Sequence, residues 1–281
     1  MILSIITINR DNAAGLKKTM LSVASQTGQD FEYVVIDGAS SDGSVEVIRS
    51  LETVFGNRLK WISEPDKGVY NAMNKGIGMA SGDYLQFLNS GDCLASNDVT
   101  ARMTEALKAN GFPTILYGNL LKEMTDGTVM KDNGFAGKTI SFHGFYTGSL
   151  NHPSTYIKKD LFEKYGRYDD SFKIVSDWKW FLQAIILGEE KPVYTDIDVT
   201  LFDMNGISVK NKALGKEERK KVLNELIPSS ILADYDSWSY SINHMKRLKR
   251  HPWAHRIVRF LERALFKIEK RKSKKSGECV Y

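Results

Sequence analysis

Three acidic residues, Asp37, Asp66 and Asp92, each stand just after a short segment with strand-like composition, and this pattern limits the possible folds more than any other feature. These strand-like segments are 32–36, 59–63 and 83–88, and the apolar run 3–8 precedes them. Helical patterns lie between successive strand-like segments, at 13–26, 45–55 and 68–79. Such alternation predicts parallel strands in one sheet with helices on both faces. Ligands bind beyond the carboxyl ends of such strands, so the three acids are expected at one ligand-binding edge.

The rest of the chain is predicted to extend this α/β domain. Asp126-Gly127 between two apolar runs indicates a hairpin, and the Gly-rich segment 133–150 is typical of a loop that lines a site. The other expected elements are strands at 114–117, 120–124, 128–131, 154–157 and 193–202, and helices at 99–110 and 177–187.

Composition fits a soluble globular protein, with 42% hydrophobic and 26% charged residues among 281. Cys93 and Cys279 cannot build a disulfide framework, so a reducing cytoplasm is the expected location. The first ten residues have no basic start before their apolar run and are expected to form a buried strand, not a signal peptide. No apolar run approaches the roughly 18 residues of a membrane span.

Several short blocks resemble the signatures of family-two glycosyltransferases with the GT-A fold. They are Val35–Ser44 (VIDGASSDGS), Ser63–Gly76 (SEPDKGVYNAMNKG), Phe87–Asp92 (FLNSGD) and Asn151–Tyr156 (NHPSTY). The nearest likeness is to the branch that builds bacterial exopolysaccharide, capsule and O-antigen repeat units, and it covers about residues 2–208. It implies a Rossmann-like mixed sheet, a nucleotide-sugar donor, a divalent metal and inversion at the anomeric carbon.

The first two blocks are expected to hold the nucleotide. A carboxylate at a strand end can accept a hydrogen bond from a uracil or guanine N–H, and Asp37 has Thr7 and Asn9 at the neighbouring strand end. The resemblance implies that Thr7, Asp37 and Asp66 contact the base and ribose. The alternative role for Asp37 and Asp42 is to accept turn and helix-cap N–H groups.

Phosphate contacts are expected around the short helix that begins near Gly68. Lys67, Asn74 and Lys75 surround this helix, whose N-terminus also favours anions. Many relatives carry Arg where Met73 stands, so the contact is expected to shift to one of the two lysines.

Asp92 is the expected metal ligand. Members of the family usually carry Asp-x-Asp in this region, whereas Asn89 and Gly91 stand at the first two acidic positions here. Mg²⁺ or Mn²⁺ held by Asp92, the donor diphosphate and waters is chemically reasonable, because Mg²⁺ retains several waters. The alternative is a plain turn aspartate.

Asp177 is the expected general base. The blocks Gly166–Asp170 (GRYDD) and Ile174–Trp178 (IVSDW) continue the resemblance, and relatives place an acid matching Asp177 at the start of a late helix. An acceptor hydroxyl is a weak nucleophile at neutral pH, and a nearby carboxylate can take its proton. His152 is a candidate for diphosphate or acceptor contact, with a structural role as the alternative.

The loop Phe202–Ser208 (FDMNGIS) is expected near the site and able to close over donor. Beyond it, 214–281 is predicted to be a helical extension of the GT-A domain 1–213. Residues 246–275 hold thirteen Lys and Arg against two Glu. The positive charge of this stretch exceeds the net charge of +5 of the whole chain, so the rest of the chain carries a net negative charge.

Pro252–Lys272 is predicted to be a basic amphipathic helix that either docks on an anionic membrane or packs on the domain. Nucleic acid is not an expected partner, because no recognition motif accompanies the charge. The predicted function is sugar transfer from a nucleotide-diphosphate donor, UDP before GDP or dTDP, to a glycan or lipid-linked acceptor on the cytoplasmic face. The alternative is a degenerate, non-catalytic scaffold in a polysaccharide assembly complex.

Overall fold

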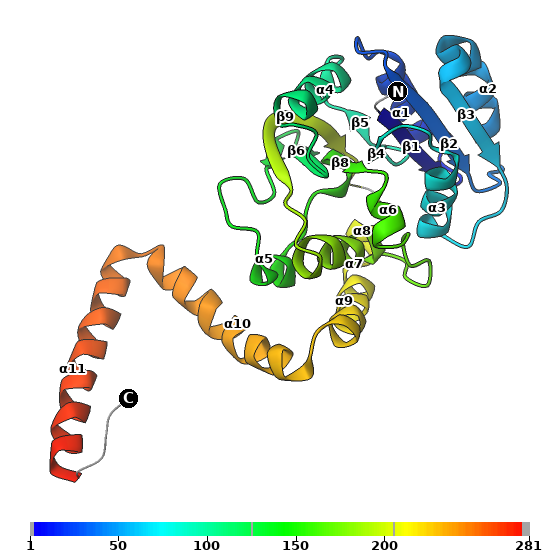
Figure 1. Ribbon diagram of the computed structural model, residues 1–281. Helices are drawn as coiled ribbons and strands as arrows, with labels where there is room; N and C mark the ends of the chain where they lie inside the picture. The colour runs from blue at the N-terminus through cyan, green and yellow to red at the C-terminus, as the bar shows by residue number, and fades with distance from the viewer. Residues whose placement is uncertain (1–2, 125, 205, 277–281) are drawn as a thin grey trace. The chain divides into compact units, whose positions relative to one another are not determined.

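The computed structural model describes residues 3–124, 126–204 and 206–276. Strands in these ranges form one mixed sheet in the order β3-β2-β1-β4-β8-β6-β9-β5, with β7 beside β6 (Figure 1). Their bounds are β1 Leu3–Asn9, β2 Phe31–Asp37, β3 Leu59–Ser63, β4 Tyr84–Phe87, β5 Cys93–Leu94, β6 Ile115–Glu123, β7 Val129–Asp132, β8 Thr155–Lys158 and β9 Val193–Phe202. The helices of the first 210 residues are α1 Ala13–Ala24, α2 Ser44–Phe55, α3 Val69–Met79, α4 Val99–Ala109, α5 Phe142–Thr147, α6 Leu161–Lys164, α7 Ser176–Phe181 and α8 Ile207–Lys210.

The first half of the sheet is parallel, as the alternation predicted. Strand β1 pairs in parallel with β2 and β4, and β2 pairs in parallel with β3. Asn9 lies opposite Asp37, which lies opposite Ser63, so three strands end at one edge. This register is what brings residues from distant parts of the sequence to a common site.

Helices cover both faces of these parallel strands. Side chains of β1 alternate between faces, so Leu3 and Ile5 join a core cluster with Leu16 of α1. Ile6 points the other way, where α3 packs so closely that a Cβ on Gly76 would lie 2.5 Å from Ile6 Cγ2. Strands β1 and β2 are buried along their whole length because both faces are covered.

Three expected elements differ from those observed. The segments 114–117 and 120–124 form one strand, β6, with a register irregularity at Gly118. A Cβ there would lie 2.5 Å from Ile197 O, so only glycine lets β9 approach and the strand continue. The expected loop 133–150 contains α5, capped by Ser141 Oγ, which accepts a hydrogen bond from Gly144 N. The late helix continues from α7 as a π-helix, Leu182–Leu187.

Chain contacts divide the protein into a unit ending at Val222 and a unit beginning at Leu223, whereas the sequence places the boundary at 213/214. Helix α9, Lys212–Leu226, crosses this division. Its earlier turns belong with the first unit because Glu218 accepts hydrogen bonds from Lys173 N and Ile174 N, both at 2.9 Å.

The second unit consists mainly of two helices, α10 Ser229–Lys249 and α11 Pro252–Ser276. Large apolar side chains of α11 are exposed, with Trp253 at 67% and Phe260 at 71%. Arg256, Arg259 and Arg263 lie on the same helix. Within the residues that the structure describes, no helix is both long and apolar enough to cross a membrane.

Candidate active site

A pocket of about 420 Å³ lies at the edge where β1 and β4 end and α3 begins. Its lining includes Asn9, Arg10, Asp66, Gly68, Asn89 and Ser90. Four of these residues come from two of the blocks that the sequence singled out, and Asn9 and Arg10 lie at the end of β1. The parallel register therefore assembles them into one concave site.

Two amide oxygens in this lining have no hydrogen-bond partner among the described residues. They are Asn9 Oδ1 and Asn89 Oδ1, and both atoms are buried. The Asn9 amide is fixed in orientation because its Nδ2 donates to Asp37 Oδ1 at 2.8 Å. A buried acceptor without a donor is costly, so a ligand carrying N–H or O–H groups would complement both oxygens.

Asp37 lies behind this pocket and does not line it. Its carboxylate is buried and accepts from Asn9 Nδ2, Ser63 Oγ, and both the backbone N–H and hydroxyl of Ser40. Burial raises the pKa of Asp37, and the bonds from Ser40, Ser63 and Asn9 outweigh burial, so the pKa lies below its usual value. In this structure Asp37 holds the pocket residue Asn9 in place.

Thr7 is likewise buried behind the pocket. Its hydroxyl donates to Leu88 O at 2.7 Å and lies 2.9 Å from the Tyr33 hydroxyl. Asp66 does line the pocket, where it accepts from Gly68 N at 2.8 Å and lies 4.0 Å from Arg10 Nη1. Of the three residues expected at the base and ribose, the structure brings Asp66 to the pocket wall.

The three expected phosphate contacts are not brought together. Asn74 binds both backbone groups of Tyr168, donating to its O at 2.8 Å and accepting from its N at 3.0 Å. Lys75 Nζ donates to Pro65 O and pairs with Glu64 at 2.8 Å. Lys67 is exposed beside the start of α3. The cation in the pocket lining is Arg10, which the sequence pattern did not single out.

Asp92 is buried in the turn that follows β4, and Asp203 is its neighbour. Asp92 Oδ1 accepts from Asp203 N at 2.8 Å. Burial raises the pKa of Asp92 to about 7, and the negative charge of Asp203 contributes to the rise. Asp203 was missed as a site residue, although it begins the loop Phe202–Ser208 that the sequence placed near the site.

Gly91 is explained by this neighbour. Its φ is +107°, and a Cβ would lie 2.7 Å from Asp203 Oδ2. A larger residue, including the aspartate usual in relatives, would displace the Asp203 carboxylate. Among the described residues no three His, Cys, Asp or Glu side chains form a metal-binding group, so Asp92 and Asp203 are a pair of carboxylates only.

Asp177 lies in the first turn of α7 and faces Tyr70 of α3. The Tyr70 hydroxyl lies 2.8 Å from Asp177 Oδ1 and 2.6 Å from Ile174 O. Burial raises the pKa of Tyr70 well above its usual value, and the Asp177 charge adds to it. Because Gly68 and Val69 line the pocket, α3 connects the pocket wall directly to Asp177.

Arg219 of α9 supplies a positive charge near Asp177. Burial lowers the pKa of Arg219 and the charge of Asp177 opposes that shift, so the two groups are near each other. The guanidinium lies 4.6 Å from the centre of the Trp178 ring and donates to Gly148 O at 3.1 Å. Sequence patterns gave no signal for Arg219, because it lies past the recognised blocks.

His152 lies in an aromatic cluster instead of the pocket. It stacks on Phe87 with ring centroids 4.9 Å apart, and its Nε2 lies 2.8 Å from the Tyr168 hydroxyl. Burial lowers the pKa of His152, with the Asp177 charge opposing, so the ring is neutral at pH 7. This environment matches the structural role that the sequence left open for it.

The family model described as Glycosyl transferase family 2 matches residues 4–166, more than half of the chain. The chain belongs to this family. Among curated relatives, the uncharacterized glycosyltransferase Rv1514c of Mycobacterium tuberculosis is 35% identical over 207 residues, which are 73% of this chain and 76% of the relative. The PGL/p-HBAD biosynthesis glycosyltransferase Rv2957 of the same species is 28% identical and covers 64% of this chain and 68% of its own.

Solved structures share the fold of this family 2 chain. Residues 1–349 of S. aureus TarS in complex with UDP-GlcNAc superpose with a TM-score of 0.61 at 17% identity, over 75% of this chain and 61% of that one. The mannosyltransferase PcManGT from Pyrobaculum calidifontis, in complex with GDP-Man and Mn²⁺, gives 0.56 at 15% identity, over 71% of this chain and 56% of that one. The predicted GT-A fold is thereby confirmed.

Proposed function

We propose that this glycosyltransferase moves a sugar from a nucleotide-diphosphate donor, UDP in the first instance, to a glycan or lipid-linked acceptor with inversion. The observation that carries the proposal is the pair of unpartnered oxygens, Asn9 Oδ1 and Asn89 Oδ1, in a pocket that α3 connects to Asp177. A nucleotide offers N–H and O–H donors to those oxygens. The UDP and UDP-GlcNAc complexes of TarS, a protein of the same fold, support UDP as the first choice.

In this proposal Asp177 is the general base. It takes the proton of the acceptor hydroxyl as that oxygen attacks the anomeric carbon, and the nucleoside diphosphate leaves from the opposite face. One displacement inverts the anomeric centre and needs no nucleophile on the enzyme. The Tyr70 hydroxyl donates to the Asp177 carboxylate and orients it, and the nearby positive charge of Arg219 favours its ionised form.

Asp92 and Asp203 are the proposed holders of a divalent cation. Two neighbouring carboxylates offer hard oxygen ligands, which suit Mg²⁺ or Mn²⁺. Diphosphate oxygens and waters would complete the coordination. When bound, the cation would neutralise the negative charge of the departing nucleoside diphosphate.

The nucleotide site is tested by thermal unfolding of the full chain with UDP, GDP and dTDP, each with and without Mn²⁺. A ligand of the native state raises the midpoint by mass action. We expect a rise with UDP that grows with Mn²⁺, and loss of that rise in Asn9→Ala. Asn71→Ala is the matched control, because Asn71 is on α3 but does not line the pocket. No rise with any nucleotide would favour the scaffold alternative.

Cell-surface polysaccharide synthesis on the cytoplasmic side of a membrane is the proposed setting. The support is the resemblance of the sequence blocks and helix α11, which carries exposed Trp253 and Phe260 together with arginines. Basic residues and interfacial aromatics on one helix suit an anionic bilayer surface. This would place the enzyme beside a lipid-linked acceptor.

Removing residues from Arg247 onward is expected to release the protein from liposomes that contain anionic lipid. The truncation deletes the whole of α11 and the arginines next to it, which supply both attractions. Co-sedimentation at low and high salt measures the effect, and neutral liposomes are the control. Equal sedimentation of the truncated and full chains would contradict membrane docking.

A further inference from the structure

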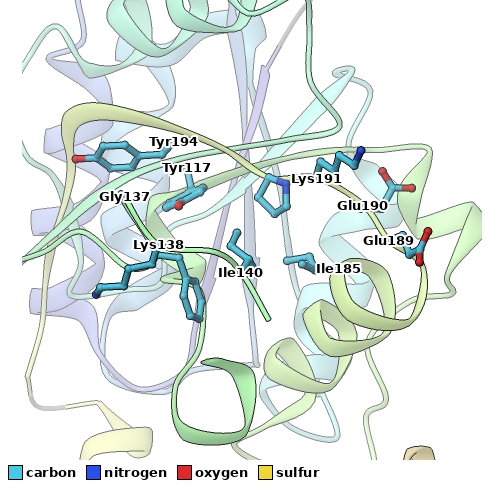
Figure 2. Close-up of a pocket in the computed structure, with 11 residues that line it drawn as sticks. Tyr117, Gly137, Lys138, Ile140, Ile185, Glu189, Glu190, Lys191 and Tyr194 are labelled. Carbon is cyan, nitrogen blue, oxygen red and sulfur yellow. The ribbon is translucent and has the colours of Figure 1, made fainter. Parts of the chain in front are cut away.

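A second pocket, of about 510 Å³, lies in the first unit away from the nucleotide pocket and shares none of its lining residues. It lies between the early part of β6 and β9, the segment 135–140, and the end of the π-helix that follows α7 (Figure 2). None of the roles proposed above uses these residues.

Two backbone irregularities meet at this second pocket. The π-helix Leu182–Leu187 contributes Ile185 to the lining, and π-helical turns are frequent at functional sites. Glu189, two residues past the π-helix, also lines the pocket and has a φ of +59°, which is strained for a residue with a Cβ. Strain of this kind concentrates at ligand sites.

The lining combines aromatic and aliphatic surface with charged groups. The rings of Tyr194 and Phe135 are partly exposed in the lining, and the buried Tyr117 supports Tyr194 from behind, with ring centroids 5.4 Å apart. Ile140 and Ile185 add aliphatic surface. Figure 2 shows the charged side chains of Lys138, Lys191 and Glu189 among the residues that line the pocket. Aromatic rings pack on the C–H faces of a sugar, and a few polar groups bind its hydroxyls.

One helical segment connects this pocket to the proposed base. Asp177 is in its first turn and Ile185 is eight residues later in the π-helical part, about 10 Å away along the helix axis, given a rise of about 1.5 Å per residue in the α-helical part and less in the π-helix. A monosaccharide cannot span that distance, whereas a short oligosaccharide can.

From this arrangement we infer that the second pocket binds a saccharide unit of an oligosaccharide acceptor, one or more units from the hydroxyl that reacts. The inference rests on the proposed function for its link to Asp177. The pocket's own observations, its partly exposed aromatic rings, the π-helix and the strain at Glu189, do not depend on donor chemistry, and the aromatic surface is the one that favours a saccharide.

The test is binding of the labelled full chain to an array of immobilised bacterial oligosaccharides and their constituent monosaccharides. Ile140→Arg puts a long charged side chain into the pocket from a half-buried position. Leu187→Arg is the matched control, because Leu187 is half-exposed on the π-helix and does not line the pocket. Glu189→Gly is the second variant, since glycine adopts this φ without strain and removes the carboxylate.

The native chain and Leu187→Arg are expected to retain oligosaccharides in preference to monosaccharides. Ile140→Arg is expected to lower the retained signal by about ten-fold or more, and Glu189→Gly by less. Equal retention by native chain and Ile140→Arg, or no retention of any glycan by the native chain, would overturn the inference. The UDP-dependent rise in unfolding midpoint, measured on the same samples, reports folding and tests the donor site separately.

Discussion

Asp177→Asn is expected to lower turnover by about 10²–10⁴-fold, the usual contribution of a positioned general base. Asparagine keeps the size of the side chain and an oxygen for the Tyr70 hydroxyl, which lies 2.8 Å from Asp177 Oδ1. It cannot take a proton from the acceptor. Because Asp177 does not line the proposed nucleotide pocket, donor binding should be retained.

Initial rates of nucleoside diphosphate release, with and without acceptor, measure this loss. The thermal shift with UDP verifies that the variant still binds donor. Asp170→Asn is the control. Asp170 is an exposed carboxylate that accepts from Asn71 Nδ2 of α3, the helix that also carries the Asp177 partner Tyr70. Turnover within a few-fold of the native rate in Asp177→Asn would remove Asp177 from the role of base.

Asp92→Asn is expected to stabilise the metal-free protein above pH 7 while abolishing its response to Mn²⁺. The pKa of Asp92 is raised by burial from 3.8 to about 7, so the folded state holds this proton more tightly than the unfolded state does. Its contribution to stability is complete below about pH 4 and is lost as pH rises towards 7. At 1.36 kcal/mol per pKa unit, the loss is of order 4 kcal/mol.

Asparagine stays neutral across this range and keeps an oxygen for the Asp203 N–H. The measurement is urea unfolding between pH 4 and pH 8 in the presence of a chelator. The free energy of unfolding of the native chain should fall as the pH rises, and the fall should be much smaller in the variant. Adding Mn²⁺ at pH 8 should restore stability to the native chain alone. If the free energy of unfolding changed with pH in the same way for both proteins, the raised pKa of Asp92 in the folded state would be refuted.

The parallel half of the fold was predictable because its signals are local. Apolar runs, helix spacing and turn residues lie within a few positions of one another, and β1 to β4 with α1 to α4 were found close to where the pattern placed them. The first helix also has a local start signal, since Asn12 Oδ1 accepts a hydrogen bond from Gly15 N. The mixed half was less accurate, since Gly118 and the π-helix depend on contacts with β9 and α5 that no local pattern encodes.

Residue types at strand ends were predictable, but the side-chain partners of those residues were not. Asp66 and Asn9 line the pocket, whereas Asp37 and Thr7, from the same strand ends, turn their polar groups into the protein. Strand alternation and register place Thr7, Asn9 and Asp37 on the same face of the sheet, but the residues that meet each of them there come from elsewhere in the chain.

The sequence by itself determined the family through its signature blocks, and the alternating strands and helices of the parallel half through periodicity and turn motifs, because these signals are local. Only the tertiary structure placed Asp203 beside Asp92 and Arg219 near Asp177, and joined Tyr117, Ile185 and Glu189 around a second pocket. Each group joins segments that are separated by tens of residues along the chain. Their proximity, and the burial that raises the pKa of Asp92 and lowers the pKa of Arg219, arise from packing of the whole first unit.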